Sequence, residues 1–140
     1  MKATGIVRRI DELGRVVIPK EIRRTQRIRQ GDPLEIFTTG DGEVIFKKYS
    51  PIGEMAAFAG QYAEVLQKNL ARTALVCDRD SVIAAAGAAR HIHIAVPIIA
   101  AGDVAGAVAL LSDEKSAVPS AEEQKALAIA AAFLAKQMES

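Results

Sequence analysis

Residues 5–24 read GIVRRIDELGRVVIPKEIRR and contain the strongest local signals for secondary structure in the chain. The first half of this stretch, residues 6–10, alternates in character with a period of two, which is typical of a β-strand. Leu13 and Gly14 then supply a turn, because glycine tolerates a positive φ angle. Residues 15–18 are rich in β-branched side chains and predict a second strand.

A short helix is predicted directly after these two strands. Pro19 suits the first position of a helix, where its missing N–H costs nothing. The helix is expected over residues 20–27, and Arg23, Arg24 and Arg27 are spaced to share one face of it. Arginine side chains suit phosphate contacts and bidentate contacts to guanine edges. The stretch therefore predicts a basic surface on a rigid scaffold.

The charge of the chain is distributed unevenly. The net charge of +1 is close to neutral, but residues 1–49 carry 11 Lys and Arg against 7 Asp and Glu. Residues 50–140 carry 7 against 10. A solvated basic face is one explanation of such a pattern. The concentration of positive charge on a turn and a helix start favours the other explanation, a nucleic-acid-binding module.

Three segments together resemble the AbrB family of bacterial transition-state regulators, and within it the stage V sporulation protein T branch. They are residues 1–25 (MKATGIVRRIDELGRVVIPKEIRRT), 28–37 (IRQGDPLEIF) and 43–51 (EVIFKKYSP). The resemblance covers about residues 1–52 and implies a swapped-hairpin β-barrel that exists only as a dimer. It also implies that arginines of the loop and helix bind DNA. The matching positions are Arg8, Arg15, Arg23 and Arg24, with Arg9 and Lys2 as further candidates.

Length and composition set further bounds. Half of the 140 residues are hydrophobic, which argues against disorder. A domain of about 50 residues is marginal alone, and dimerisation would remedy that. Cys77 is the only cysteine, so no internal disulfide can form, as suits a reducing cytoplasm. Neither a signal peptide nor an apolar run of the roughly 20 residues needed to span a bilayer is present. We therefore expect a soluble, cytoplasmic protein without a membrane partner.

The first domain is expected over residues 1–50. Residues 34–38 alternate in the manner of a strand, and residues 43–48 return as its partner. The four residues between them, Thr-Gly-Asp-Gly, form a hairpin signal of the Asp-Gly type. This AbrB-like domain thus needs four strands and one helix.

The second domain is expected over residues 51–140. A linking helix reaches about Leu70, four strands follow, and a last helix begins with Ser120 and Glu123 at capping-box spacing. This order, and the phrase VPIIAAGDVAGAVAL over residues 96–110, resemble a GAF domain, so the fold class is α+β. In GAF domains a long segment between the second and third strands forms much of the ligand pocket. Here only residues 86–90 join them, which predicts a reduced pocket.

Chemistry of other kinds is not indicated. His91 and His93 alternate along a strand and are expected on one face, but two imidazoles are too few for a metal site. The chain has no serine elbow, Walker loop, CxxC pair or dinucleotide-binding glycine pattern. We therefore expect no enzyme activity, no metal and no cofactor.

The leading hypothesis is a bacterial DNA-binding transcription regulator, by resemblance one of sporulation genes. Its partners would be double-stranded DNA and further copies of the chain. The copies would form a dimer through the N-terminal domain, with a tetramer through the helices and the C-terminal domain left open. Two alternatives remain: a swapped-hairpin antitoxin that represses its own operon and neutralises a toxin, and a GAF-like module that senses a small-molecule effector.

Overall fold

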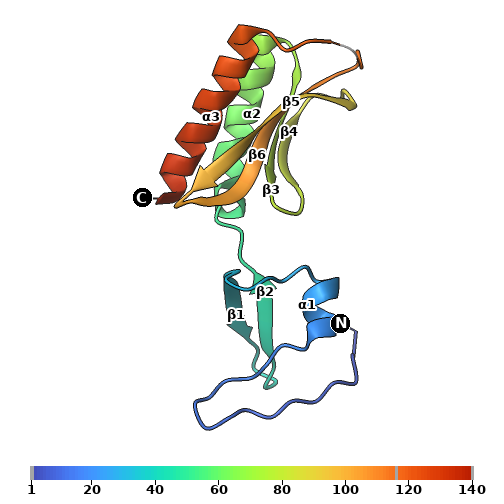
Figure 1. Cartoon of the computed structure of the whole chain (residues 1–140), viewed down its shortest axis with the longest axis vertical. Helices are drawn as coiled ribbons and strands as arrows, with labels where there is room; N and C mark the ends of the chain where they lie inside the picture. Colours follow the sequence, from blue (N-terminus) through green and yellow to red (C-terminus); the bar gives the residue numbers. More distant parts are fainter. Residues whose placement is uncertain (1, 116, 140) are drawn as a thin grey trace. The chain divides into compact units, whose positions relative to one another are not determined.

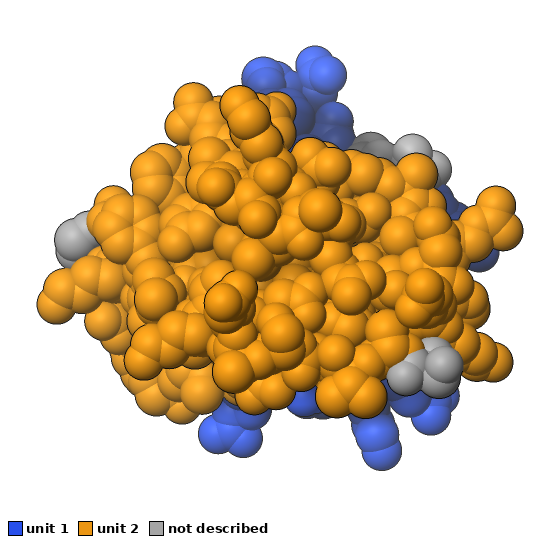
Figure 2. Space-filling view, turned by 90° about the horizontal axis from the view of Figure 1, so that it is seen from above, with its two compact units in different colours: residues 1–49 blue, residues 50–140 orange. Residues whose placement is uncertain are grey.

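The computed structural model describes residues 2–115 and 117–139. The chain divides into two compact units, Met1–Tyr49 and Ser50–Ser140 (Figures 1 and 2). Each unit has its own sheet, two-stranded in the first and four-stranded in the second. The two units are described separately below.

The first unit contains helix α1 (Lys20–Thr25) and a hairpin of β1 (Leu34–Thr38) and β2 (Val44–Lys48). The hairpin confirms the prediction made from the Asp-Gly signal. Helix α1 is shorter than predicted, because Arg27 has a φ of +57°. The N–H of Ile28 donates to the carbonyl of Arg23 at 2.8 Å, and that of Arg27 donates to Arg24 at 3.3 Å. These bonds form a Schellman motif, which takes Arg27 off the helical face of Arg23 and corrects the expected three-arginine face.

The two strands predicted before α1 are absent from the single chain. Residues 6–10 and 15–18 are free of ladder hydrogen bonds, and Figure 1 shows this part as an open excursion of the chain (dark blue). A strand forms only where a neighbouring strand supplies hydrogen-bond partners, and β1 and β2 pair only with each other. The prediction of four strands in this unit is therefore wrong for one chain alone.

The second unit is a four-stranded antiparallel sheet with two helices on one face (Figure 1). Its strand order is β4-β3-β6-β5. In chain order the elements are η1 (Gly53–Met55), α2 (Ala56–Leu70), β3 (Thr73–Asp78), β4 (Val82–Ala86), β5 (His91–Ala100), β6 (Asp103–Ser112) and α3 (Ala121–Glu139). The core lies between sheet and helices, where Leu66, Ile98, Leu110, Leu127 and Leu134 are buried. The α+β class and the order of elements follow the prediction.

Side-chain hydrogen bonds lie at the start of η1 and at the start of α3, whereas the first residue of α2 has no side-chain cap. The hydroxyl of Ser50 accepts a hydrogen bond from the N–H of Gly53 at 3.0 Å, at the start of η1. At α3, the Ser120 hydroxyl accepts from the N–H of Glu123 at 3.1 Å, and the Glu123 carboxylate accepts from the N–H of Ser120 at 2.9 Å. This pair confirms the predicted capping box.

Over residues 2–115 and 117–139, no helix is long and apolar enough to cross a membrane.

Candidate nucleic-acid interface

The turn between residues 11 and 15 is closed by the backbone and carboxylate of Asp11. The N–H of Asp11 donates to the carbonyl of Arg15 at 2.9 Å, and the N–H of Gly14 donates to the carbonyl of Asp11 at 3.0 Å. The Oδ1 atom of Asp11 accepts from the N–H groups of Leu13 and Arg15, at 2.9 and 2.8 Å. Gly14 has a φ of +79°, which a side chain at this position would disfavour. The turn is therefore defined by local hydrogen bonds.

The guanidinium of Arg15 is held by the same carboxylate. Its Nε donates to Oδ2 of Asp11 at 2.9 Å, although the Arg15 side chain is 71% exposed. The pKa of Asp11 is lowered, first by the hydrogen bond from the backbone N–H of Arg15 and then by the one from its side chain. The carboxylate is therefore ionised at neutral pH and carries the charge that attracts the arginine.

Helix α1 carries two further candidate arginines, Arg23 and Arg24. Pro19, buried, precedes the helix, and the Nε of Arg23 donates to the carbonyl of Ile18 at 3.0 Å. Arg23 is thereby tied to the backbone before its own helix. Arg24, the next residue, is exposed. The last turn of α1 thus places two cations at its surface.

The remaining candidates are held less firmly. Arg8 donates from Nη1 to the carbonyl of Val7 at 3.0 Å, in the segment before the turn. Among the described residues, no hydrogen bond holds the exposed side chains of Arg9, Arg24 or Lys2. In the single chain, separate hydrogen bonds therefore hold the side chains of Arg15 and Arg23. Among the described residues, no hydrogen bond joins two of the candidate DNA-binding side chains.

Sequence reasoning overlooked Asp11 as part of this site. Aspartate commonly accepts hydrogen bonds from backbone N–H groups that follow it, and it stands three residues before a glycine turn. That spacing was the available signal. A pattern of positive charges alone does not include it.

A second polar cluster lies in the other unit, around Glu123. Its Oε2 accepts from the Nε of Arg72 at 2.7 Å, and its Oε1 lies 3.0 Å from the Nε2 of His93. Arg72 also donates from Nη1 to the hydroxyl of Ser112 at 3.1 Å. Burial by itself would raise the pKa of Glu123, but hydrogen bonds from Ser120, His93 and Arg72 outweigh it and lower the pKa to about 2. The carboxylate therefore stays ionised.

The two histidines do not share a face as predicted. The pairing of β5 with β6 shifts between Ile92 and Ile94, so His93 is the extra residue of a β-bulge. The His93 side chain is fully buried against Glu123, whereas His91 is exposed. Over the described residues, no three His, Cys, Asp or Glu side chains come close enough together to hold a metal ion.

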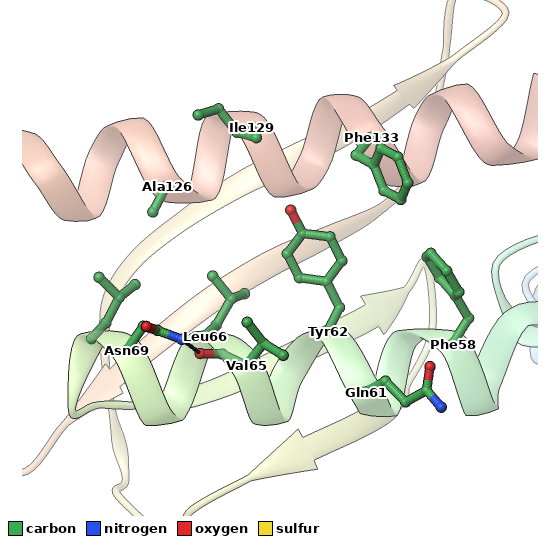
Figure 3. Close-up of a pocket in the computed structure, with 10 residues that line it drawn as sticks. Phe58, Gln61, Tyr62, Val65, Leu66, Asn69, Ala126, Ile129 and Phe133 are labelled. Carbon is green, nitrogen blue, oxygen red and sulfur yellow. Dashed lines mark hydrogen bonds between the residues drawn. The ribbon is translucent and has the colours of Figure 1, made fainter.

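An apolar groove lies between α2 and α3 (Figure 3). Phe58 and Tyr62 of α2 meet Phe133 of α3, with ring centroids 5.8 and 6.1 Å apart. Val65 and Ile129 line it further along, and both are more than half exposed. Phe133 is 42% exposed at this groove, because it lies beside the buried stripe of α3 that contains Leu127 and Leu134.

Comparisons with known proteins match each of the two units to a protein family. Residues 54–93 and 89–139 match the family "Stage V sporulation protein T C-terminal, transcription factor", and residues 7–54 match "Antidote-toxin recognition MazE, bacterial antitoxin". Stage V sporulation protein T of Bacillus subtilis (strain 168) is 45% identical over 179 residues, covering 99% of each chain. The chain belongs to the stage V sporulation protein T family.

Two further relatives match the N-terminal unit. The transition state regulatory protein AbrB of the same organism is 61% identical over 51 residues, which are 36% of this chain and 52% of AbrB. A solution structure of the N-domain of the transcription factor abrB has 59% identity and a TM-score of 0.32, covering 35% of this chain and 92% of that domain. The N-terminal unit of this member of the stage V sporulation protein T family is thus AbrB-like in sequence.

This member of the stage V sporulation protein T family lacks an internal segment of its relative. The alignment spans 179 residues, whereas this chain has 140, and the family match breaks near residues 89–93. The break coincides with the short link between β4 and β5. There the hydroxyl of Thr73 accepts from the N–H of Ala89 at 3.0 Å, and Gly87 has a φ of +109°. The link is therefore packed directly against the start of β3.

Proposed function

We propose that this chain is a bacterial transcription regulator of sporulation genes that acts in the cytoplasm on double-stranded DNA. The observation that carries the proposal is the exposed, hydrogen-bonded placement of Arg15 and Arg23 in a unit of net positive charge. Arg8 and Arg24 complete the proposed contact set, with Arg9 and Lys2 at its margin. Residues 1–50 form the DNA-binding domain, and residues 51–140 form the linking helix and the C-terminal domain.

The DNA-binding unit is proposed to be a swapped-hairpin dimer. Its described residues include one buried side chain, Pro19. Apolar side chains are exposed throughout it, most of all Val7 at 84%, with Ile10, Val17, Ile36 and Val44 also more than half exposed. A monomer with this surface has no core to offset the entropy of folding. In a dimer, residues 6–10 and 15–18 gain ladder partners and the apolar side chains are buried between two chains.

The C-terminal unit is proposed to be a GAF-like domain that assembles two dimers into a tetramer. The groove of Phe58, Tyr62 and Phe133 is an exposed aromatic surface of the kind that interfaces use. A second copy of the two helices would cover it. A ligand-sensing role loses support, because β4 and β5 are joined by a link of four residues where GAF domains build their pocket.

The antitoxin alternative is supported by the family match of residues 7–54 alone. Residues beyond that match fold into a unit with its own core and do not form a polar tail. Purification of the chain with its native neighbours tests this alternative. Stoichiometric recovery of a nuclease would favour the antitoxin.

The DNA-binding proposal is tested by fluorescence anisotropy with a labelled duplex that the parent protein enriches from a random pool. Arg15→Ala and Arg23→Ala should each weaken binding by about 1–3 kcal/mol if these arginines reach bases. Arg90→Ala removes an exposed arginine of the other unit and serves as the matched control. If the double variant Arg15→Ala/Arg23→Ala binds as tightly as the parent, the proposal is rejected.

A further inference from the structure

We propose that Asp11 is a positioning residue for DNA recognition, whose carboxylate aims the Arg15 guanidinium at the duplex. This inference rests on the proposed DNA-binding function. An acidic residue beside a phosphate-binding surface is electrostatically unfavourable, so its presence calls for a structural role. The hydrogen bonds of the turn supply one.

The two oxygens of the Asp11 carboxylate have separate tasks. Oδ1 accepts from the backbone N–H groups of Leu13 and Arg15, which shapes the turn. Among the residues that the structure describes, Oδ2 accepts only from the Nε of Arg15, at 2.9 Å. The backbone of the turn is already satisfied by Oδ1, so the bond to Oδ2 acts on the arginine side chain alone.

The bond at Nε leaves the outer edge of the guanidinium available. An arginine has five N–H donors, and Asp11 occupies the one at Nε. The four N–H donors on Nη1 and Nη2 remain to donate to N7 and O6 of a guanine or to two phosphate oxygens. Because a long exposed side chain otherwise loses rotamer freedom on binding, holding Arg15 beforehand lowers the cost of recognition.

The variant Asp11→Asn separates the two tasks. Its amide oxygen can still accept from Leu13 and Arg15, but its NH₂ group cannot accept a hydrogen bond from Nε. Glu12→Gln is the matched control, since it removes one negative charge from the adjacent, exposed residue. If only charge mattered, both variants would bind DNA slightly more tightly than the parent.

The test uses the full chain and the duplex enriched by the parent protein. We expect Asp11→Asn to bind roughly tenfold more weakly than Glu12→Gln, the loss typical of one charge-assisted contact. In an Arg15→Ala background, Asp11→Asn should cause no further loss. Equal affinity of the two single variants overturns the proposal, and so does an undiminished loss in the Arg15→Ala background, because Asp11 would then act on the turn alone.

A measurement on the parent keeps the proposal testable if Asp11→Asn fails to fold. In ¹⁵N NMR spectra of the free protein, the Arg15 Nε–H resonance should be resolved and slow to exchange at pH 7. An Arg15 Nε–H signal that exchanges as fast as that of Arg90 would contradict the proposal. If the parent binds no duplex at all, the proposed function itself fails, which is a different result from a silent Asp11→Asn.

Discussion

The Nε2 atom of His93 and the Oε1 atom of Glu123 lie 3.0 Å apart, in residues separated by 30 positions of the chain. The same carboxylate completes the α3 capping box with Ser120 and accepts a hydrogen bond from Arg72. One side chain, 11% exposed, therefore ties the start of α3 to β5 and to the link between α2 and β3.

Glu123→Gln should destabilise the second unit by on the order of 3 kcal/mol at pH 7, since a carboxyl whose pKa falls from 4.5 to about 2 on folding stabilises the fold by that amount. A lowered pKa contributes stability that is complete above pH 4.5 and is lost as the pH falls towards 2. The difference between parent and variant in urea unfolding should therefore shrink between pH 5 and pH 2.

Glu122→Gln, at the exposed neighbouring position, controls for the loss of one charge near the start of α3. It should unfold within about 0.5 kcal/mol of the parent. A Glu123→Gln variant that matches it at pH 7 would show that the cluster adds nothing to stability.

Gly87→Ala should be strongly destabilising. Gly87 has a φ of +109°, and an added Cβ would overlap both Cα and Cβ of Thr73. Backbone strain at such a φ costs about 1–3 kcal/mol, before any steric overlap is counted. Gly60→Ala is the control, since Gly60 lies in α2 with open space at its Cβ, and it should be stabilising by about 0.5–1 kcal/mol. Thermal unfolding that shifts both variants in the same direction would contradict this expectation.

Arg23→Ala should reduce the salt dependence of DNA binding if Arg23 contacts a phosphate. Each phosphate contact contributes about −0.9 to the slope of log K against log salt concentration, so a dimer losing two contacts should have a slope smaller by about 2. Anisotropy titrations between 50 and 200 mM salt, about the range in which such effects are large, measure this slope. Arg90→Ala should leave the slope unchanged, and an identical slope for Arg23→Ala would remove Arg23 from the phosphate contacts.

Phe133→Asp should dissociate the proposed tetramer into dimers. A carboxylate in the aromatic groove would be desolvated by a covering copy, and truncation of a central interface aromatic typically costs about 2 kcal/mol or more. Light scattering after size exclusion should report half the mass of the parent. Ala128→Asp places the same charge on an exposed position of α3 outside the groove and should keep the parent mass. A parent that is already a dimer would refute the tetramer directly.

Several elements could be predicted from the sequence because their signals are local. The hairpin of β1 and β2 follows from alternation around an Asp-Gly turn, and the start of α3 follows from Ser120 and Glu123. The second unit has the predicted order of one helix, four strands and a last helix. The placement of Arg15 on a turn and of Arg23 and Arg24 on a short helix could also be predicted.

Features that depend on distant residues were not predicted. Alternation along β5 placed His91 and His93 together, but the bulge opposite β6 separates them. The spacing of Arg72, His93 and Glu123 along the sequence does not predict that the first two side chains contact the third. The absence of strands before α1 has the same cause. An alternating segment can predict a strand, but it does not show which other strand supplies the hydrogen-bond partners.

The order of helices and strands, and the cations at the exposed turn and helix, could be predicted from the sequence, because alternation, capping and turn preferences act over a few residues. The contacts of Glu123 with Arg72 and His93 could not be predicted in this way. They depend on where folded segments bring distant polar atoms within hydrogen-bond distance, which a linear pattern does not encode.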